Sequence, residues 1–95
     1  MNSHFVYILA SKRNGTLYIG YTNDLKRRIR EHKKEKSSVS FTKRYGVKML
    51  VYYEKYIDEK SAFKRERQMK KWNRKWKINL VEEKNPEWKD LFDEL

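Results

Sequence analysis

A glutamate within an otherwise apolar stripe is the residue of this sequence that most needs a chemical explanation. A helix is predicted over 59–72, and at roughly 100° per residue Glu66 falls on the side of that helix that carries Ala62 and Met69. A glutamate on an inward face is rare unless it is paired or bound to a metal. Glu66 is therefore a candidate metal ligand or general base. The alternative is a buried salt bridge, with Arg28 as a possible partner.

The preceding helix, predicted over 23–36, places a basic residue and a histidine beside its apolar stripe. Arg28 and His32 share the face of Leu25, whereas Arg27 points away from it. A charge beside a buried stripe needs a partner or a function. The alternative is an ordinary amphipathic helix whose Arg28 pairs with a carboxylate.

Two tyrosines lie on neighbouring predicted strands. Asn14-Gly15 is a strong hairpin signal, because both residue types tolerate positive φ. A hairpin centred on this pair places Tyr18 opposite Ser11, on the same face as Tyr7 but several residues away, and a slipped register would bring the tyrosines closer. Tyrosines on a sheet face are more often core residues than catalytic ones, so core packing is the alternative.

Together these residues form a spaced series that resembles the GIY-YIG nuclease family. Its members are Tyr7, Tyr18-Ile19-Gly20, Arg28, His32 and Glu66. The resemblance covers nearly the whole chain and is closest to small stand-alone bacterial members. The first motif departs from the family, because it has Phe5-Val6-Tyr7 in place of Gly-Ile-Tyr. The combination is the specific signal, since any single piece of it is weak.

The resemblance implies a metal-dependent endonuclease that cleaves phosphodiester bonds of DNA, either structured or single-stranded. Glu66 would hold Mg²⁺ or Mn²⁺, which take oxygen ligands. Arg28 would bind the scissile phosphate through two hydrogen bonds. Tyr7 or Tyr18, directly or with His32, would help to deprotonate the attacking water, provided that a cation lowers the tyrosine pKa from about 10. The spacing does not choose among three candidates for a family-like active-site asparagine: Asn73, Asn79 and Asn85.

The net charge of +11, from 24 Lys and Arg against 13 Asp and Glu, predicts a polyanionic partner. Nucleic acid is expected, with DNA favoured over RNA, and the alternative is a solvated basic surface. The candidates for phosphate contact are Lys33, Lys34, Lys36, Lys43 and Arg44.

Trp72 and Trp76 interleave with the basic residues between positions 70 and 77. Such a mixture could stack bases and bind phosphates. We favour the alternative, in which both tryptophans complete the core over the sheet, because a small domain needs large apolar residues.

The elements that would position these residues follow the order β-β-α-β-α-α, which predicts an α+β fold with a three-stranded antiparallel sheet and flanking helices. The predicted strands cover 4–10, 16–22 and 47–55, and a third helix covers 74–83. The predicted helix caps are Thr22, Asp58 and Asn73, and Pro86 is predicted to begin a short terminal helix. All of 1–95 is expected to be a single GIY-YIG-like domain, with its core at about 4–82 and a C-terminal helical tail at 85–95.

Composition narrows the class of protein further. A chain of 95 residues without cysteine has room for one core and excludes disulfides and thiolate metal sites. No apolar run approaches the ~18 residues of a membrane span. We expect a cytoplasmic monomer with no membrane partner. The rival function is a non-catalytic, basic nucleic-acid-binding module that keeps the GIY-YIG fold.

Overall fold

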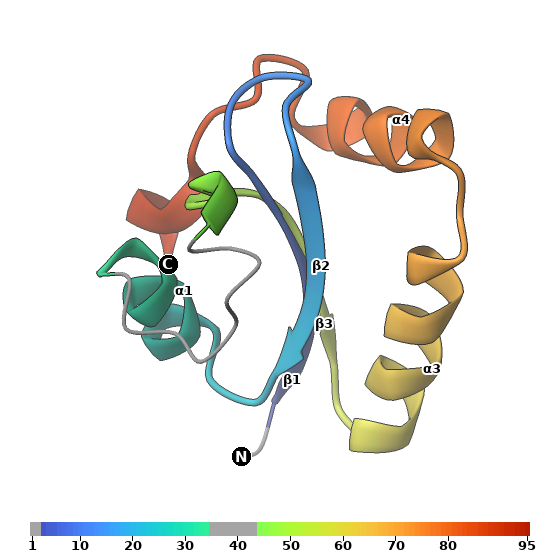
Figure 1. Ribbon diagram of the computed structural model, residues 1–95. Helices are drawn as coiled ribbons and strands as arrows, with labels where there is room; N and C mark the ends of the chain where they lie inside the picture. The colour runs from blue at the N-terminus through green and yellow to red at the C-terminus, as the bar shows by residue number, and fades with distance from the viewer. Residues whose placement is uncertain (1–2, 35–43) are drawn as a thin grey trace.

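The structure is a computed structural model that describes residues 3–34 and 44–95 (Figure 1). Lys36 and Lys43 lie outside these residues. The strands are β1 (His4–Ala10), β2 (Leu17–Thr22) and β3 (Met49–Tyr56). The helices are α1 (Leu25–Lys33), α3 (Glu59–Lys70) and α4 (Arg74–Lys84), followed by the short 3₁₀ helix η1 (Leu91–Glu94). The predicted order and the α+β class are confirmed.

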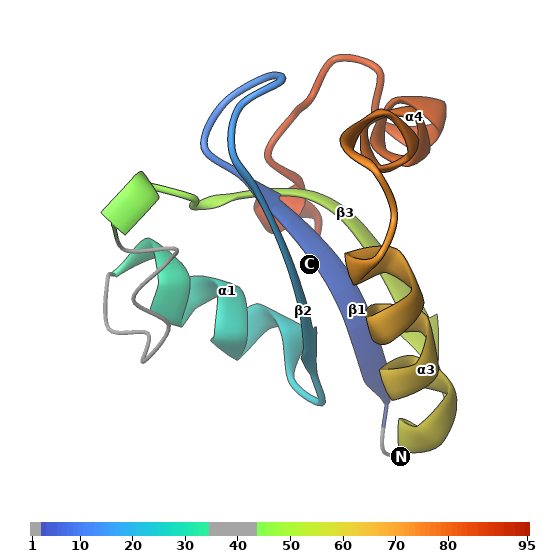
Figure 2. The same ribbon diagram turned by 45° about the vertical axis from the view of Figure 1, so that its right-hand side comes forward.

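The antiparallel sheet has the strand order β2-β1-β3, so β1 is the central strand. Helix α1 covers one face of the sheet, and α3 and α4 cover the other (Figures 1 and 2). Because both faces are covered, the side chains from Val6 to Ala10 are all buried. This explains why β1 is apolar at successive positions instead of alternating with polar residues.

Alternation along β1 separates two cores. Val6 and Ile8 join the core beneath α3 and α4, which includes Met69. Tyr7 and Leu9 point the other way, into a core beneath α1. The side-chain period of two therefore assigns Tyr7 to the α1 side of the sheet.

The β1–β2 register differs from the one predicted, because the connecting turn is longer. Tyr18 pairs with Leu9, and Tyr7 pairs with Gly20. Ser11 N donates to the carbonyl of Thr16, which leaves four residues in the turn. Asn14 takes a positive φ of 56° within this turn, so the Asn-Gly pair lies at its far side instead of its centre. The shift keeps the shared face that was predicted and brings the two tyrosines together.

Two predicted helix starts are also corrected. Asp24, not Thr22, caps α1, because the Asp24 side chain accepts from the backbone N–H of Arg27. Pro86 does not begin a helix, because Asn85 holds the chain in a turn. The Asn85 side chain accepts from Lys89 N and donates to the carbonyl of Val51. Asp58 and Asn73 cap α3 and α4 as predicted.

The C-terminal segment crosses from one side of the sheet to the other (Figure 1). Trp88 is buried in the core beneath α3 and α4. Leu91, Phe92 and Leu95 pack instead against the core beneath α1. Among residues 3–34 and 44–95, no helix has the length and apolar character to cross a membrane.

Candidate active site

Helix α1 presents its residues as its periodicity predicts. Leu25, Ile29 and His32 are buried against the sheet. Arg28 lies at the border of this face with 28% of its side chain exposed, whereas the neighbouring Arg27 is 66% exposed. The face assignment of the two arginines is therefore confirmed.

Tyr7, Tyr18 and His32 form an aromatic cluster between α1 and the sheet. The Tyr7 hydroxyl lies 3.2 Å from Nε2 of His32, within hydrogen-bonding distance. The ring centroids of Tyr7 and Tyr18 are 6.4 Å apart, and that of His32 lies 6.1 Å from Tyr7 and 5.8 Å from Tyr18. Tyr7 is buried, and Tyr18 is partly exposed.

Gly20 makes room for this cluster. A Cβ at Gly20 would lie 2.5 Å from both Cζ and the hydroxyl of Tyr7, and 3.0 Å from Cε2 of Tyr18. Any side chain here would displace the Tyr7 ring. The Gly20 position of the Tyr-Ile-Gly motif is thus required by packing against the tyrosine of the opposite strand.

Burial and Arg28 set the protonation states of the cluster. Burial raises the pKa of Tyr7 to about 12, against the lowering effect of its hydrogen bond with Arg28. Burial, together with the nearby charge of Arg28, lowers the pKa of His32 to about 4. Tyr7 and His32 are therefore neutral at pH 7, and Arg28 supplies the positive charge.

Arg28 also forms part of an open hollow beside the cluster. Its Nη1 lies 3.4 Å from Oε1 of Glu31 on the same helix. The hollow is lined from both sides of the sheet edge, by His4, Tyr21, Thr22, Asn23, Arg27, Arg28, Glu31 and Glu59. Sequence reasoning missed Glu31, although its position three residues after Arg28 is typical of a helical ion pair. The guanidinium of Arg28 can thus meet an anion that enters from solvent.

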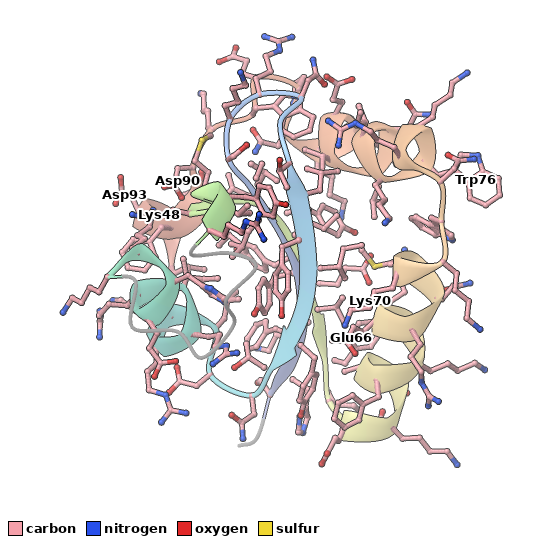
Figure 3. The ribbon with its side chains drawn as sticks, in the orientation of Figure 1. Lys48, Glu66, Lys70, Trp76, Asp90 and Asp93 are labelled. Atoms are coloured by element: carbon pink, nitrogen blue, oxygen red, sulfur yellow. The ribbon has the colours of Figure 1, made fainter. Side chains whose placement is uncertain are left out.

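Glu66 faces the sheet from α3, across from α1 (Figure 3). Its side chain is 15% exposed and pairs with Lys70 at 3.4 Å. Arg28 comes from α1 on the other side of the sheet (Figure 2) and pairs with Glu31. The salt bridge between Glu66 and Arg28 that we considered is therefore not the one that forms. The Glu66 charge nevertheless contributes to raising the pKa of Tyr7 and of Tyr21, in both cases after burial as the larger cause.

Glu66 is the side chain that would hold the divalent metal implied by the family resemblance. Among the described residues, no three His, Asp or Glu side chains are grouped to enclose a metal ion. Mg²⁺ does not need such an enclosure, because it is commonly held by one or two carboxylates with waters and substrate phosphates. Lys70 is half-exposed and can move its ammonium into solvent, which would free the Glu66 carboxylate. Glu66 therefore fits an open magnesium or manganese site.

The three candidate phosphate-binding residues within the described chain differ in their surroundings. Lys33 is engaged within the fold, because its ammonium pairs with Asp90 and donates to the Lys48 carbonyl at 3.2 Å. Lys34 and Arg44 are exposed. Binding of nucleic acid by these residues stays a prediction.

A family model described as the GIY-YIG catalytic domain matches residues 3–79. The chain belongs to the GIY-YIG family. A UPF0213 protein of Staphylococcus aureus strain Mu3 is 37% identical over 84 residues, which cover 88% of this chain and 100% of that protein. The UPF0213 protein of Bacillus halodurans, whose solution structure is known, has 32% sequence identity to this chain. The match covers 93% of this chain and 92% of the Bacillus halodurans chain, with a TM-score of 0.57. Small stand-alone GIY-YIG proteins are thus its relatives.

The altered first GIY-YIG motif leaves the pairing of β1 intact at Phe5. Phe5 pairs with Thr22 on one side and with Lys55 on the other. Its ring packs edge-on against Tyr53, with centroids 6.5 Å apart. The residue that replaces the family glycine is therefore accommodated on the same face as Tyr7.

The structure separates the three asparagines that could serve a GIY-YIG site. Asn73 caps α4. Asn85 is buried, and its side chain donates hydrogen bonds to the carbonyls of Val51 and Lys89. Asn79 is exposed and lines a hollow with Trp76. Structural roles thus account for two of the three.

Proposed function

We propose that this GIY-YIG protein is a metal-dependent endonuclease that cleaves phosphodiester bonds of DNA. The observation that carries the proposal is the convergence of Tyr7, Tyr18, Arg28 and His32 from three elements onto one side of the sheet. Core packing alone does not require a guanidinium at the border of an aromatic cluster, with an open hollow next to it. The proposal takes the chain as one domain, acting as a cytoplasmic monomer.

Each residue has a role that follows from its position. Arg28, partly exposed, binds the non-bridging oxygens of the scissile phosphate and stabilises the charge that grows there. Tyr18 contacts the attacking water, because it is the more exposed of the two tyrosines. Tyr7 and the neutral His32 position Tyr18 and the Arg28 guanidinium. Proximity and orientation supply much of the rate enhancement in such a site.

Glu66 would hold the divalent cation, which supplies Lewis-acid stabilisation of phosphoryl charge when it is bound. Its own charge also contributes, after burial as the larger cause, to raising the pKa of Tyr7. The remaining oxygen ligands would be waters and oxygens of the nucleic acid, as is common for magnesium held by a single carboxylate.

The test is a cleavage assay on single-stranded, duplex, flap and branched DNA, with Mg²⁺, Mn²⁺ or chelator, for the parent and for Glu66→Gln. We expect cleavage by the parent only with metal, and none by the variant. The variant should keep its thermal stability within about 1 kcal/mol, because the partner ammonium of Lys70 can reach water. It should also bind DNA in chelator as well as the parent does.

A parent that binds nucleic acid but cuts none of these substrates would leave the non-catalytic binding module as the better assignment. Strong destabilisation of Glu66→Gln, combined with no effect of Mn²⁺ on the melting of the parent, would show that Glu66 is a structural ion-pair residue.

A further inference from the structure

Trp76 is exposed in a way that core packing does not explain. Trp72 packs against the core beneath α3 and α4, as expected, but 54% of Trp76 is exposed. The expectation that both tryptophans complete the core is therefore wrong for Trp76. Figure 3 shows its ring pointing away from the molecule at the start of α4. An indole in solvent keeps a large apolar face available for a partner.

The two indoles are held in a fixed arrangement. Asn73 accepts a hydrogen bond from Trp76 N at 2.9 Å, which fixes the first turn of α4. Arg74 donates to the carbonyls of Asn14 and Gly15, which attaches this turn to the β1–β2 hairpin. The Trp72 and Trp76 rings lie nearly perpendicular, with centroids 6.1 Å apart. A surface that is ordered before binding loses less entropy when a ligand arrives.

The ring of Trp72 has its own support. The Arg65 guanidinium lies 4.9 Å from its centroid, and Arg65 is in turn held by Glu54 at 2.9 Å. A shallow hollow next to the indoles is lined by Trp72, Trp76, Asn79, Leu80 and Glu83. The amide of Asn79 offers both a donor and an acceptor at this hollow, as the edge of a nucleobase requires.

The charge around the indoles selects the class of ligand. Residues 59–84 contain ten Lys and Arg against four Glu. Lys71 and Lys75 directly precede the two tryptophans and are exposed. The ligand should therefore offer flat aromatic faces and a chain of negative charge together. Unpaired nucleotides have both, whereas a duplex hides its base faces within the stack.

We propose that the exposed face of Trp76, which Trp72 supports edge-on, is a base-stacking platform for single-stranded nucleic acid. The platform lies on the α3–α4 side of the sheet, and the aromatic cluster of Tyr7, Tyr18 and His32 lies on the α1 side (Figure 2). It binds a part of the strand away from the scissile phosphate. The inference rests on the proposed nucleic-acid function but concerns a different surface and a different kind of contact.

The test measures the affinity of labelled oligo-dT, oligo-U and a DNA duplex of equal length, in chelator and at several salt concentrations. Trp76→Ala should weaken binding of both single strands about tenfold and change duplex binding less than about twofold. The slope of affinity against salt should stay the same, because no cation is removed. Ile57→Ala is the matched control, since Ile57 is also a large exposed apolar residue, and it should have no effect.

Two further variants separate stacking from charge. Trp76→Phe should recover part of the single-strand affinity, because it keeps an aromatic face. Lys75→Ala should weaken single strands and duplex alike and reduce the salt slope by about one.

The platform would be excluded if Trp76→Ala bound single strands as the parent does, or if it weakened duplex binding equally. Failure of the parent to bind any of the three probes at low salt would overturn both this inference and the proposed function. Metal-dependent cleavage by a Trp76→Ala variant with parental single-strand affinity would overturn the platform alone.

Discussion

Two consecutive arginines of α1 show how a single helical step places equal charges in different surroundings. Arg28 contacts the Tyr7 hydroxyl at the border of the buried face, and Arg27 lies mostly in solvent near its helix cap, Asp24. The Arg27–Asp24 separation of 3.9 Å between exposed groups is worth little to stability. The pair is therefore a matched set in which charge is equal and only position differs.

We expect Arg28→Ala to reduce DNA cleavage at least 100-fold, because it removes the charge that faces the phosphate in the proposed site. Arg27→Ala should reduce affinity only slightly and leave the rate at saturating DNA nearly unchanged. Single-turnover cleavage and binding measured in parallel provide the comparison. Similar losses of rate in the two variants would show that the site does not depend on Arg28.

At the scale of elements, Glu54 joins β3 to α3. Its carboxylate accepts two hydrogen bonds from Arg65, at 2.9 and 3.0 Å, and one each from the hydroxyls of Tyr52 and Tyr56. These donors, led by Arg65, hold the pKa of Glu54 below its usual range despite the opposing effect of burial. The same Arg65 supports Trp72, so this ion pair connects the sheet to the proposed stacking platform.

The lowered pKa makes the contribution of Glu54 depend on pH. It is fully present above the unfolded-state pKa of about 4.3 and is lost as the pH falls through the lower folded-state pKa. Glu54→Gln should reduce the free energy of unfolding by about 3 kcal/mol at pH 7, because Arg65 loses its charged partner in a mostly buried setting. The difference between variant and parent should shrink in acid below pH 4. Denaturant unfolding from pH 3 to 7 measures it, and a difference independent of pH would contradict the ionised pair.

Elements were easier to predict than the contacts between them. Periods of two and 3.6 correctly gave the faces of Tyr7, Arg28 and His32, because burial acts on each residue of an element locally. The β1–β2 register was not predictable in the same way, since it depends on hydrogen bonds across the turn. The prediction that Trp76 lies in the core was wrong for another reason, because apolar residues are found on surfaces as well as in cores. Its exposure depends on how the helices pack together, and its ring points away from the molecule (Figure 3).

At the scale of the whole molecule, the C-terminal segment connects the two sides of the sheet. Asp90 lies where this segment reaches α1 and β3 (Figure 3). Its carboxylate accepts from Leu50 N at 3.2 Å, from Phe92 N at 3.1 Å and from the Lys33 ammonium. This one partly exposed carboxylate thus accepts hydrogen bonds from β3, from α1 and from the start of η1. Lys33 and Leu50 are far from Asp90 in sequence, which explains why sequence patterns did not predict this contact.

Asp90→Ala should therefore destabilise the fold by about 2 kcal/mol, through the loss of a cap and of charged hydrogen bonds that solvent partly screens. For a domain of this size that lowers the melting temperature by roughly 10 °C. Asp93→Ala is the control, because Asp93 lies on the exposed side of the same short helix, and it should melt like the parent.

In the Lys33→Ala background the effect of Asp90→Ala should be smaller, since the two groups share one interaction. DNA affinity distinguishes the roles of Lys33: a partner of Asp90 affects stability more than binding. If Lys33→Ala kept the parental stability but clearly lost DNA binding, Lys33 would be a nucleic-acid contact and not mainly a structural partner of Asp90.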